Sequence, residues 1–388
     1  MIERDFILAF SNSVGVGPKG FQKLLKKFGT ARDAWENDTL AKYKEVGIGK
    51  SNFAKFAEFK KSFDIQNYLG MLNKARVTFI PYGDKYYPES LRKLDSPPIG
   101  LYVKGNKELL LSCHSELVSE SRQNLSSWLD QDQANSSVIA VVGARKITSY
   151  GRQVTETLVS QLVSYGFIIV SGMALGVDGV AHQATLDANG STIAVLGCGV
   201  DCPYPRENEK LYENILDKNG LIISEYPLGM PATVGSFPAR NRIVSGLSSS
   251  VLITEAAEGS GSLITAEFAI KQGKTVFAVP GPITSQMSQG SLKLLKQGAI
   301  LVSSVDDILS ELRIKNHESG IYVIARSEAT KQSLNADERK IFYCVQDEEK
   351  TIDEISRETK IPNTKLSVML SKMELSGILK SSEGKFRV

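Results

Sequence analysis

The chain has few of the residues on which most catalytic and metal centres depend. It has three histidines and four cysteines in 388 residues, and only Cys198 and Cys202 lie close together in sequence. A single CxxxC without a second cluster is weak evidence for metal, so we expect no metal site and reduced thiols. Long apolar runs and a signal-peptide pattern are also missing, which predicts a cytoplasmic protein with no membrane segment.

Two common nucleotide-binding patterns are absent as well. In "VVGARKITSYG", Arg145 stands where the dinucleotide fingerprint GxGxxG needs its second glycine, and no acidic residue ends the next strand to hold a ribose. In "KEVGIGKS", Lys44 occupies the first glycine position of a phosphate-binding loop, and no strand precedes it. We therefore expect no bound cofactor.

Charge is distributed unevenly along the chain, although the net value is only +3. Residues 1–107 carry 19 Lys and Arg against 11 Asp and Glu, whereas residues 138–312 carry 12 against 15. The first region therefore offers a diffuse positive field suited to a polyanion, or simply a soluble lysine-rich surface. Any anion site in the middle region must be built locally from a few placed groups.

The middle region alternates apolar strands with segments of helical length. The strand candidates are "SVIAVVGA", "FIIVSGM", "STIAVLGCG", "GLIISEY", "SSVLITEAA", "KTVFAVPG" and "AILVSS". Continuous apolar strands between helices are typical of a parallel sheet covered on both faces, so the sequence predicts a doubly wound α/β fold. Ligands of such folds bind beyond the carboxyl ends of the strands.

The regions on either side predict smaller helical modules. Two turns, "VGVGPKG" and "VGIGKS", each precede an amphipathic helix, the pattern of a helix-hairpin-helix, which binds phosphate or merely joins helices. The C-terminal tail predicts three helices and a hairpin, a winged helix that binds either DNA or protein. The expected segments are a helical domain (1–70), a connector packed on the core (71–108), a flexible insertion (109–137), the α/β domain (138–314), a linker or insertion (315–335) and the winged helix (336–388).

Small and polar residues follow the predicted strands at one edge of the sheet. Arg145 projects from the turn after the first strand, and the loop "EGSGS" offers backbone N–H groups at the start of a helix. These elements should meet because the carboxyl ends of parallel strands share one edge. Besides Arg145, the predicted ligand-binding residues here are Gly143, Ser171, Gly172, Ser260, Gly261 and Ser262.

The segment "SFPARNRIVSGL" predicts a helix that presents two arginines. Arg240 and Arg242 lie two positions apart, about 200° around a helix, so they cannot both face one phosphate. We expect Arg240, with Asn241 beside it, to face the ligand. Arg242 should instead pin the helix to Glu225 or Glu255.

One histidine lies in the α/β region, four residues after an aspartate. Asp178 and His182 share a helix face and could form an acid–base pair, but a structural role for the two residues is the more common one. We therefore expect no catalytic residues.

Taken together, these motifs resemble the DNA-processing protein A (DprA/Smf) family. The resemblance rests on "VVGARKITSYG", "IIVSGMALGVDGVAHQATL", "SFPARNRIVSGLSSSVLITEAAEGSGSLITAEFAI" and the "MELSGILK" pattern of the tail. It implies an extended Rossmann-like domain that dimerises, binds single-stranded DNA and loads the recombinase RecA during natural transformation, without cofactor or catalysis. It also implies DNA-binding roles for Arg145, Arg240, Asn241 and Arg242.

A second interpretation is a nucleotide-processing enzyme. The layout is similar to that of cytokinin-activating phosphoribohydrolases, whose PGGxGTxxE loop stands where "EGSGSLITAE" stands here. Glu267 would then correspond to the glutamate of that motif.

Overall fold

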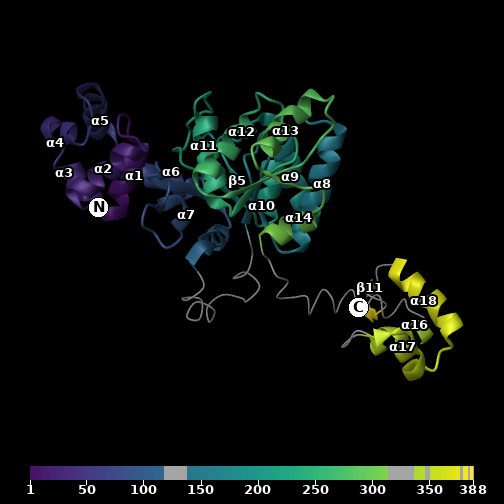
Figure 1. Ribbon diagram of the computed structural model, residues 1–388. Helices are drawn as coiled ribbons and strands as arrows, with labels where there is room; N and C mark the ends of the chain where they lie inside the picture. Colours follow the sequence, from purple (N-terminus) through teal and green to yellow (C-terminus); the bar gives the residue numbers. More distant parts are fainter. Residues whose placement is uncertain (118–137, 313–335, 346–349, 376–378, 383–384, 388) are drawn as a thin grey trace. The chain divides into compact units, whose positions relative to one another are not determined.

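The computed structural model describes residues 1–117, 138–312, 336–345, 350–375, 379–382 and 385–387. The chain divides into two compact units, Met1–Ile308 and Leu309–Val388 (Figure 1). The first unit contains a helical region followed by a large sheet with its helices, and the second is a winged helix. This confirms the predicted fold class.

A nine-stranded sheet in the order β1-β2-β6-β5-β4-β3-β7-β8-β9 forms the centre of the first unit. All strands from β3 onward run parallel, while β1 and β2 are antiparallel to each other and β2 is antiparallel to β6. The bounds are β1 Thr78–Pro81, β2 Gly100–Gly105, β3 Val138–Val142, β4 Ile168–Ser171, β5 Thr192–Val195, β6 Leu221–Ser224, β7 Ser250–Ile253, β8 Thr275–Ala278 and β9 Ile300–Leu301.

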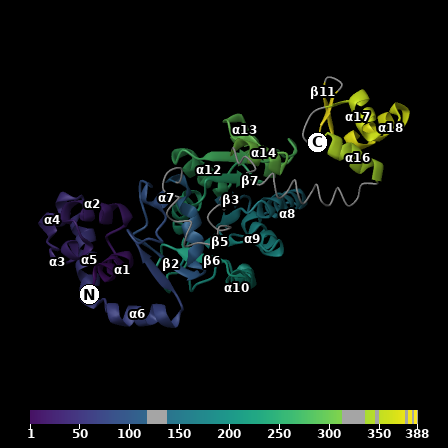
Figure 2. The ribbon, with the colours of Figure 1, turned by 90° about the horizontal axis from the view of Figure 1, so that it is seen from below.

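Helices cover both faces of this sheet, as Figure 2 shows. Helices α8, α9 and α10 pack in a row on one face, and α7 and α12 lie on the other face with α11 packed between them. The bounds are α7 Glu89–Arg92, α8 Ser149–Ser164, α9 Val177–Asp187, α10 Glu209–Asp217, α11 Ser236–Leu247, α12 Gly261–Lys271, α13 Gln289–Lys296 and α14 Val305–Glu311. Short 3-10 turns are η1 Lys107–Leu117, η3 Arg206–Asn208 and η4 Gln286–Ser288.

The connector contributes more than the sequence predicted, because β1 and β2 extend the sheet through β6. The predicted insertion is partly corrected: residues 109–117 belong to η1, whose Leu109, Leu110 and Cys113 are buried in the sheet core. The rest of that insertion, residues 118–137, and the predicted linker 315–335 lie outside the described residues.

The N-terminal region is a helical bundle built around the two glycine turns. Gly17 caps α2 and Gly49 caps α5 without a side-chain hydrogen bond, and the turns touch, since a Cβ at Gly15 would lie 2.2 Å from the carbonyl oxygen of Asn52. Aromatic residues fill the core, with Phe10 and Phe56 stacked at 5.4 Å. The bounds are α1 Glu3–Asn12, α2 Pro18–Phe28, α3 Ala31–Glu36, α4 Leu40–Glu45, α5 Lys50–Ser62 and α6 Ile65–Lys74.

The second unit has the predicted winged-helix order. Helices α16 Ala336–Cys344, α17 Ile352–Thr359 and α18 Asn363–Leu375 surround a core that includes Ile355 and Leu366. Strands β10 Lys350–Thr351, β11 Lys380–Ser382 and β12 Lys385–Arg387 form a small antiparallel sheet in the order β10-β12-β11.

Candidate nucleic-acid interface

The candidate site lies at the topological switch point of the sheet, where the strands that follow β3 in sequence change from one side of it to the other. Strand β3 is flanked by β4 on one side and β7 on the other, so the loops after β3 and β7 leave the same edge in different directions. Such a switch point is where open α/β sheets bind their ligands. Here the turn at 143–148 contacts Glu255, the second residue after β7, and the predicted loop at 258–262 follows a few residues later in the chain.

Glu255, at the end of β7, fixes the turn that carries Arg145. Its backbone oxygen accepts a hydrogen bond from the amide of Ala144 at 2.7 Å. Its carboxylate accepts two more, from the Thr148 amide at 2.8 Å and the Thr148 hydroxyl at 2.6 Å. The Thr148 hydroxyl in turn caps α8 by accepting from the Gly151 amide. The position of Arg145 is therefore set by the sheet and by the start of α8.

Arg145 lies over the half-buried ring of Phe237, and the exposed Tyr204 lies beside that ring. Its guanidinium carbon is 5.3 Å from the centre of the Phe237 ring, and the Tyr204 ring lies 5.5 Å from that of Phe237. Tyr204 is 49 % exposed, and the Arg145 side chain is exposed as well. We call Arg145, Tyr204 and Phe237 the stacking surface. The sequence analysis missed both aromatic residues, although a Phe and a Tyr beside arginines in "SFPARN" and "YPREN" were a usable signal.

The expectation that Arg240 faces the ligand is wrong. Its side chain is 4 % exposed, and its guanidinium donates to the carbonyl oxygens of Gly172 and Val195, at the ends of β4 and β5. Burial lowers the pKa of Arg240, and the nearby carboxylate of Asp178 opposes that shift. Arg240 therefore joins α11 to the ends of β4 and β5 beneath the site, and we call this buried layer the floor of the site.

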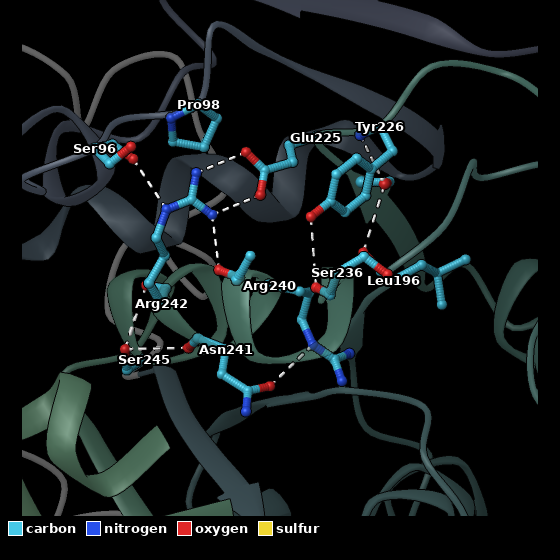
Figure 3. Close-up of polar contacts among 12 residues, drawn as sticks. Ser96, Pro98, Leu196, Glu225, Tyr226, Ser236, Arg240, Asn241, Arg242 and Ser245 are labelled. Atoms are coloured by element: carbon cyan, nitrogen blue, oxygen red, sulfur yellow. Dashed lines mark hydrogen bonds and ion pairs between the residues drawn. The ribbon is translucent and has the colours of Figure 1, made fainter. Parts of the chain in front are cut away.

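Arg242 pins α11, as predicted. It forms a two-pronged ion pair with Glu225 at 2.5 and 2.6 Å and donates from Nε to the carbonyl oxygen of Ser96 at 3.0 Å. Figure 3 shows Arg242 directed toward Glu225 while Arg240 leaves the helix on another side. Burial lowers the Arg242 pKa, but the hydrogen bond and charge of Glu225 outweigh it and raise that pKa. This pair leaves Arg242 committed to the fold.

Asn241 joins α11 to the start of α12. Its Nδ2 donates to the Gly261 carbonyl at 3.3 Å, and its Oδ1 accepts from Arg240 Nε at 3.2 Å. The predicted amide cradle is smaller than expected, because the Ser262 amide already donates to the Ser260 hydroxyl and Ser262 is buried. Gly259 and Gly261, which flank the N-cap Ser260 of α12, are exposed residues.

Three more residues predicted to bind the ligand form the floor instead. Ser171 is fully buried and donates from Oγ to the Val141 carbonyl at 2.7 Å. A Cβ at Gly172 would lie 2.5 Å from Arg240 Nη1, and one at Gly143 would lie 2.6 Å from the Glu255 carbonyl oxygen. These residues are small because other groups of the protein pack against them, and this is a correction to the sequence prediction.

Asp178 and His182 are buried, but they bind different partners. His182 Nδ1 donates to the hydroxyl of Thr192 at 2.7 Å, since that hydroxyl donates in turn to the Ile169 carbonyl. Asp178 accepts from the Ala174 amide at 3.3 Å. Burial and the charge of Arg240 lower the pKa of His182 to about 3, and burial raises that of Asp178. Both residues support α9 and its loop.

Among the residues that the structure describes, no three His, Cys, Asp or Glu side chains come together as a metal ion would require. None of the described helices is both long and apolar enough to cross a membrane.

Comparison with known families decides the identity of this fold. Residues 129–313 match the model of DNA recombination-mediator protein A, and residues 325–385 match the DprA winged helix domain. The chain is 33 % identical to protein Smf of Escherichia coli over 346 residues, covering 88 % of this chain and 84 % of that protein. The chain belongs to the DprA/Smf family.

Other DprA proteins agree with this assignment. DprA of Bacillus subtilis is 38 % identical over 62 % of this chain and 73 % of its own length. The crystal structure of DprA from Streptococcus pneumoniae superposes with a TM-score of 0.63 at 31 % identity, covering 80 % of this chain and 98 % of that one. A DprA structure from Helicobacter pylori, described for its single-stranded DNA binding mode, has a TM-score of 0.51 at 32 % identity and covers 62 % of this chain and 98 % of that one.

Proposed function

We propose that this DprA-family chain binds single-stranded DNA across the sheet edge that carries the stacking surface. The observation that carries the proposal is the contact of the exposed Arg145 guanidinium with Phe237 at 5.3 Å, with Tyr204 beside it. Proteins that bind single strands combine cations for the phosphates with aromatic faces on which bases stack. Duplex DNA keeps its bases paired and hidden, so this arrangement favours the single strand.

The electrostatics of the site are local. Residues 138–312 carry more acidic than basic residues, yet the exposed Arg145, Gly259 and Gly261 all follow the carboxyl ends of the neighbouring parallel strands β3 and β7. The start of α12 adds the positive end of a helix dipole, which favours phosphate. Arg240 and Arg242 contribute indirectly, because they hold α11 and with it Phe237 and Asn241.

The remaining expectations are part of the same proposal. As a recombination mediator, the chain would pass single-stranded DNA to RecA during natural transformation, act in the cytoplasm and need no catalytic step. It would work as a homodimer through the α/β domain. Support for that interface comes from β9, an edge strand of the sheet, where Leu301 is 50 % exposed.

Fluorescence anisotropy with labelled oligo-dT tests the DNA proposal. Phe237→Ala should weaken binding about tenfold, because a stacked base contributes roughly 1–3 kcal/mol. Arg145→Ala should also reduce the slope of log affinity against log salt by about 0.7, the value for one phosphate contact on a single strand. Phe237→Tyr and Lys146→Ala are the matched controls, which keep the ring and remove a neighbouring charge. Unchanged affinity of both Phe237→Ala and Arg145→Ala for the oligonucleotide would refute the proposal.

The enzyme alternative is tested with the same preparation. Glu267 is exposed on α12 and would have to act on a nucleoside monophosphate bound near the loop. Hydrolysis at an ordinary enzymatic rate of about 1 per second or more, with no affinity for oligonucleotides, would favour that alternative. Binding without turnover supports the mediator.

A further inference from the structure

A hollow of about 590 Å³ lies between α8, α9 and α10, next to the stacking surface. Its volume is in the range of about 300–1,000 Å³ that is usual for small-ligand sites. The lining residues that bear on its chemistry are Arg152, Leu175, Gln183, Asn208, Lys210 and Asn214. None of them was predicted from the sequence to contact DNA.

The hollow adjoins the stacking surface through two of its walls. Gly176 lines it, and a Cβ there would lie 2.1 Å from the Ala144 carbonyl oxygen and 2.6 Å from that of Arg145, so this wall packs on the Arg145 turn. The second wall, η3, begins two residues after Tyr204. Asn208 ties η3 to the loop after β4 by donating to the Met173 carbonyl at 2.9 Å. A strand that crosses the stacking surface therefore reaches this hollow next.

The lining suits a nucleotide unit. Lys210 and Arg152 are exposed cations, and the Arg152 side chain is 56 % exposed with only a 3.6 Å contact to Glu156. Amide side chains, including Asn214 and Gln183, provide donors and acceptors for the edge of a base. Leu175, which is 39 % exposed, adds an apolar wall against which a base can lie.

We propose that this hollow receives a further nucleotide of the same DNA strand, with its base in the hollow and its phosphates at Arg152 and Lys210. The inference rests on the proposed single-strand binding and extends its path. A free nucleotide is disfavoured because Glu207 lines the hollow and would repel a phosphate dianion there. A tethered nucleotide needs less intrinsic affinity, since its neighbours hold it at high effective concentration.

The experiment compares oligo-dT of about 4 and about 16 nucleotides, the range of single-strand site sizes, by fluorescence anisotropy. Lys210→Glu should weaken binding of the long oligonucleotide about tenfold and that of the short one less than about twofold, because only the long one reaches the hollow. Gln183→Trp, an exposed position on α9, should fill the hollow and give the same length dependence without changing charge. Lys271→Glu, at the far end of α12, is the control for a general charge effect and should alter neither affinity.

Each other result has a defined reading. Equal losses at both lengths, or wild-type affinity of both hollow variants for the long oligonucleotide, would overturn this inference and leave the stacking surface in place. Millimolar thymidine monophosphate could also compete with the long oligonucleotide. If it removed only the part of the affinity that Lys210→Glu removes, the hollow would bind a free nucleotide and the inference would be overturned. Absence of binding of the wild-type chain to either oligonucleotide would refute the proposed function itself.

Discussion

The N-terminal helical region and the central sheet edge use positive charge in opposite ways. On α2, Lys19, Lys23 and Lys26 recur every three or four residues on one exposed face, within a region that carries a clear surplus of basic residues. In the central region the formal balance is negative, yet three arginines at the sheet edge have defined contacts: Arg240 is buried, Arg242 is paired with Glu225 and Arg145 lies over an aromatic ring.

This difference shows that net charge and a binding site are separate properties. The lysines of α2 produce a long-range field that salt screens within about 10 Å, and their side chains can adopt many positions. The three arginines of the sheet edge are instead held in one position by their contacts with the rest of the protein. If this comparison is correct, substitutions at the edge should change stability or binding strongly, and substitutions on α2 should change both weakly.

The largest effect should come from Arg240→Ala. Removing this guanidinium leaves Asp178 buried without its counter-charge and two carbonyl groups without a donor, at a cost of about 3–5 kcal/mol of unfolding free energy. Urea denaturation measures the loss, and Arg240→Lys should recover part of it. A loss below about 1 kcal/mol, together with abolished DNA binding, would restore the ligand-facing role for Arg240.

A smaller loss is expected from breaking the Arg242–Glu225 pair, whose side chains are 11 % and 9 % exposed. Glu225→Gln and Arg242→Ala should each reduce the unfolding free energy by about 2–3 kcal/mol, and the double variant should cost less than their sum. Strict additivity in this double-mutant cycle would show that the pair is not coupled.

Acid should lower the stability of the fold through the buried His182. His182 has a pKa of about 3 in the fold, whereas an unfolded histidine titrates near its ordinary value of about 6.5. Between these values only the unfolded state takes up the proton, so the stability linked to His182 is complete above about pH 6.5 and falls by up to about 1.4 kcal/mol per pH unit below it. Urea midpoints of the wild type should drop more steeply with acid than those of His182→Gln; parallel curves would contradict this.

The smallest effect is expected on α2. Lys19→Glu with Lys23→Glu should weaken single-strand binding by less than about threefold, and the difference should vanish at high salt because the charges act through solvent. Arg145→Glu, measured alongside, supplies the contrast. A tenfold loss from the α2 variant that survives high salt would mean that the helical region has a defined DNA site of its own.

The sequence was sufficient for the main architecture and for part of the site. The seven apolar segments became β3 to β9, because buried parallel strands leave a strong pattern. The helix arithmetic correctly separated Arg240 from Arg242, and Glu225 is one of the two partners that it proposed for Arg242. Helix arithmetic could not predict that the Arg240 side chain is buried. Which side of α11 faces solvent depends on how far that helix sits below the loops after β4 and β5, and this is a property of packing.

Two further features could not be predicted for related reasons. Strands β1 and β2 contain Pro81, Gly100 and Gly105, which are depleted in strands, so the pairing of β1 with β2 and of β2 with β6 arises from tertiary context. The contacts of Phe237 with Arg145 and with Tyr204 join three segments far apart in the chain, each unremarkable by itself. Pairwise contacts of this kind leave no local pattern in one sequence.

The glycines beneath the edge leave no spare volume there. An added methyl group at Gly172 would occupy the place of the Arg240 guanidinium, and one at Gly176 would collide with the backbone that presents Arg145. Adaptation of this protein to a different strand or a different salt environment must therefore work through the side chains above that layer, while the layer itself stays invariant.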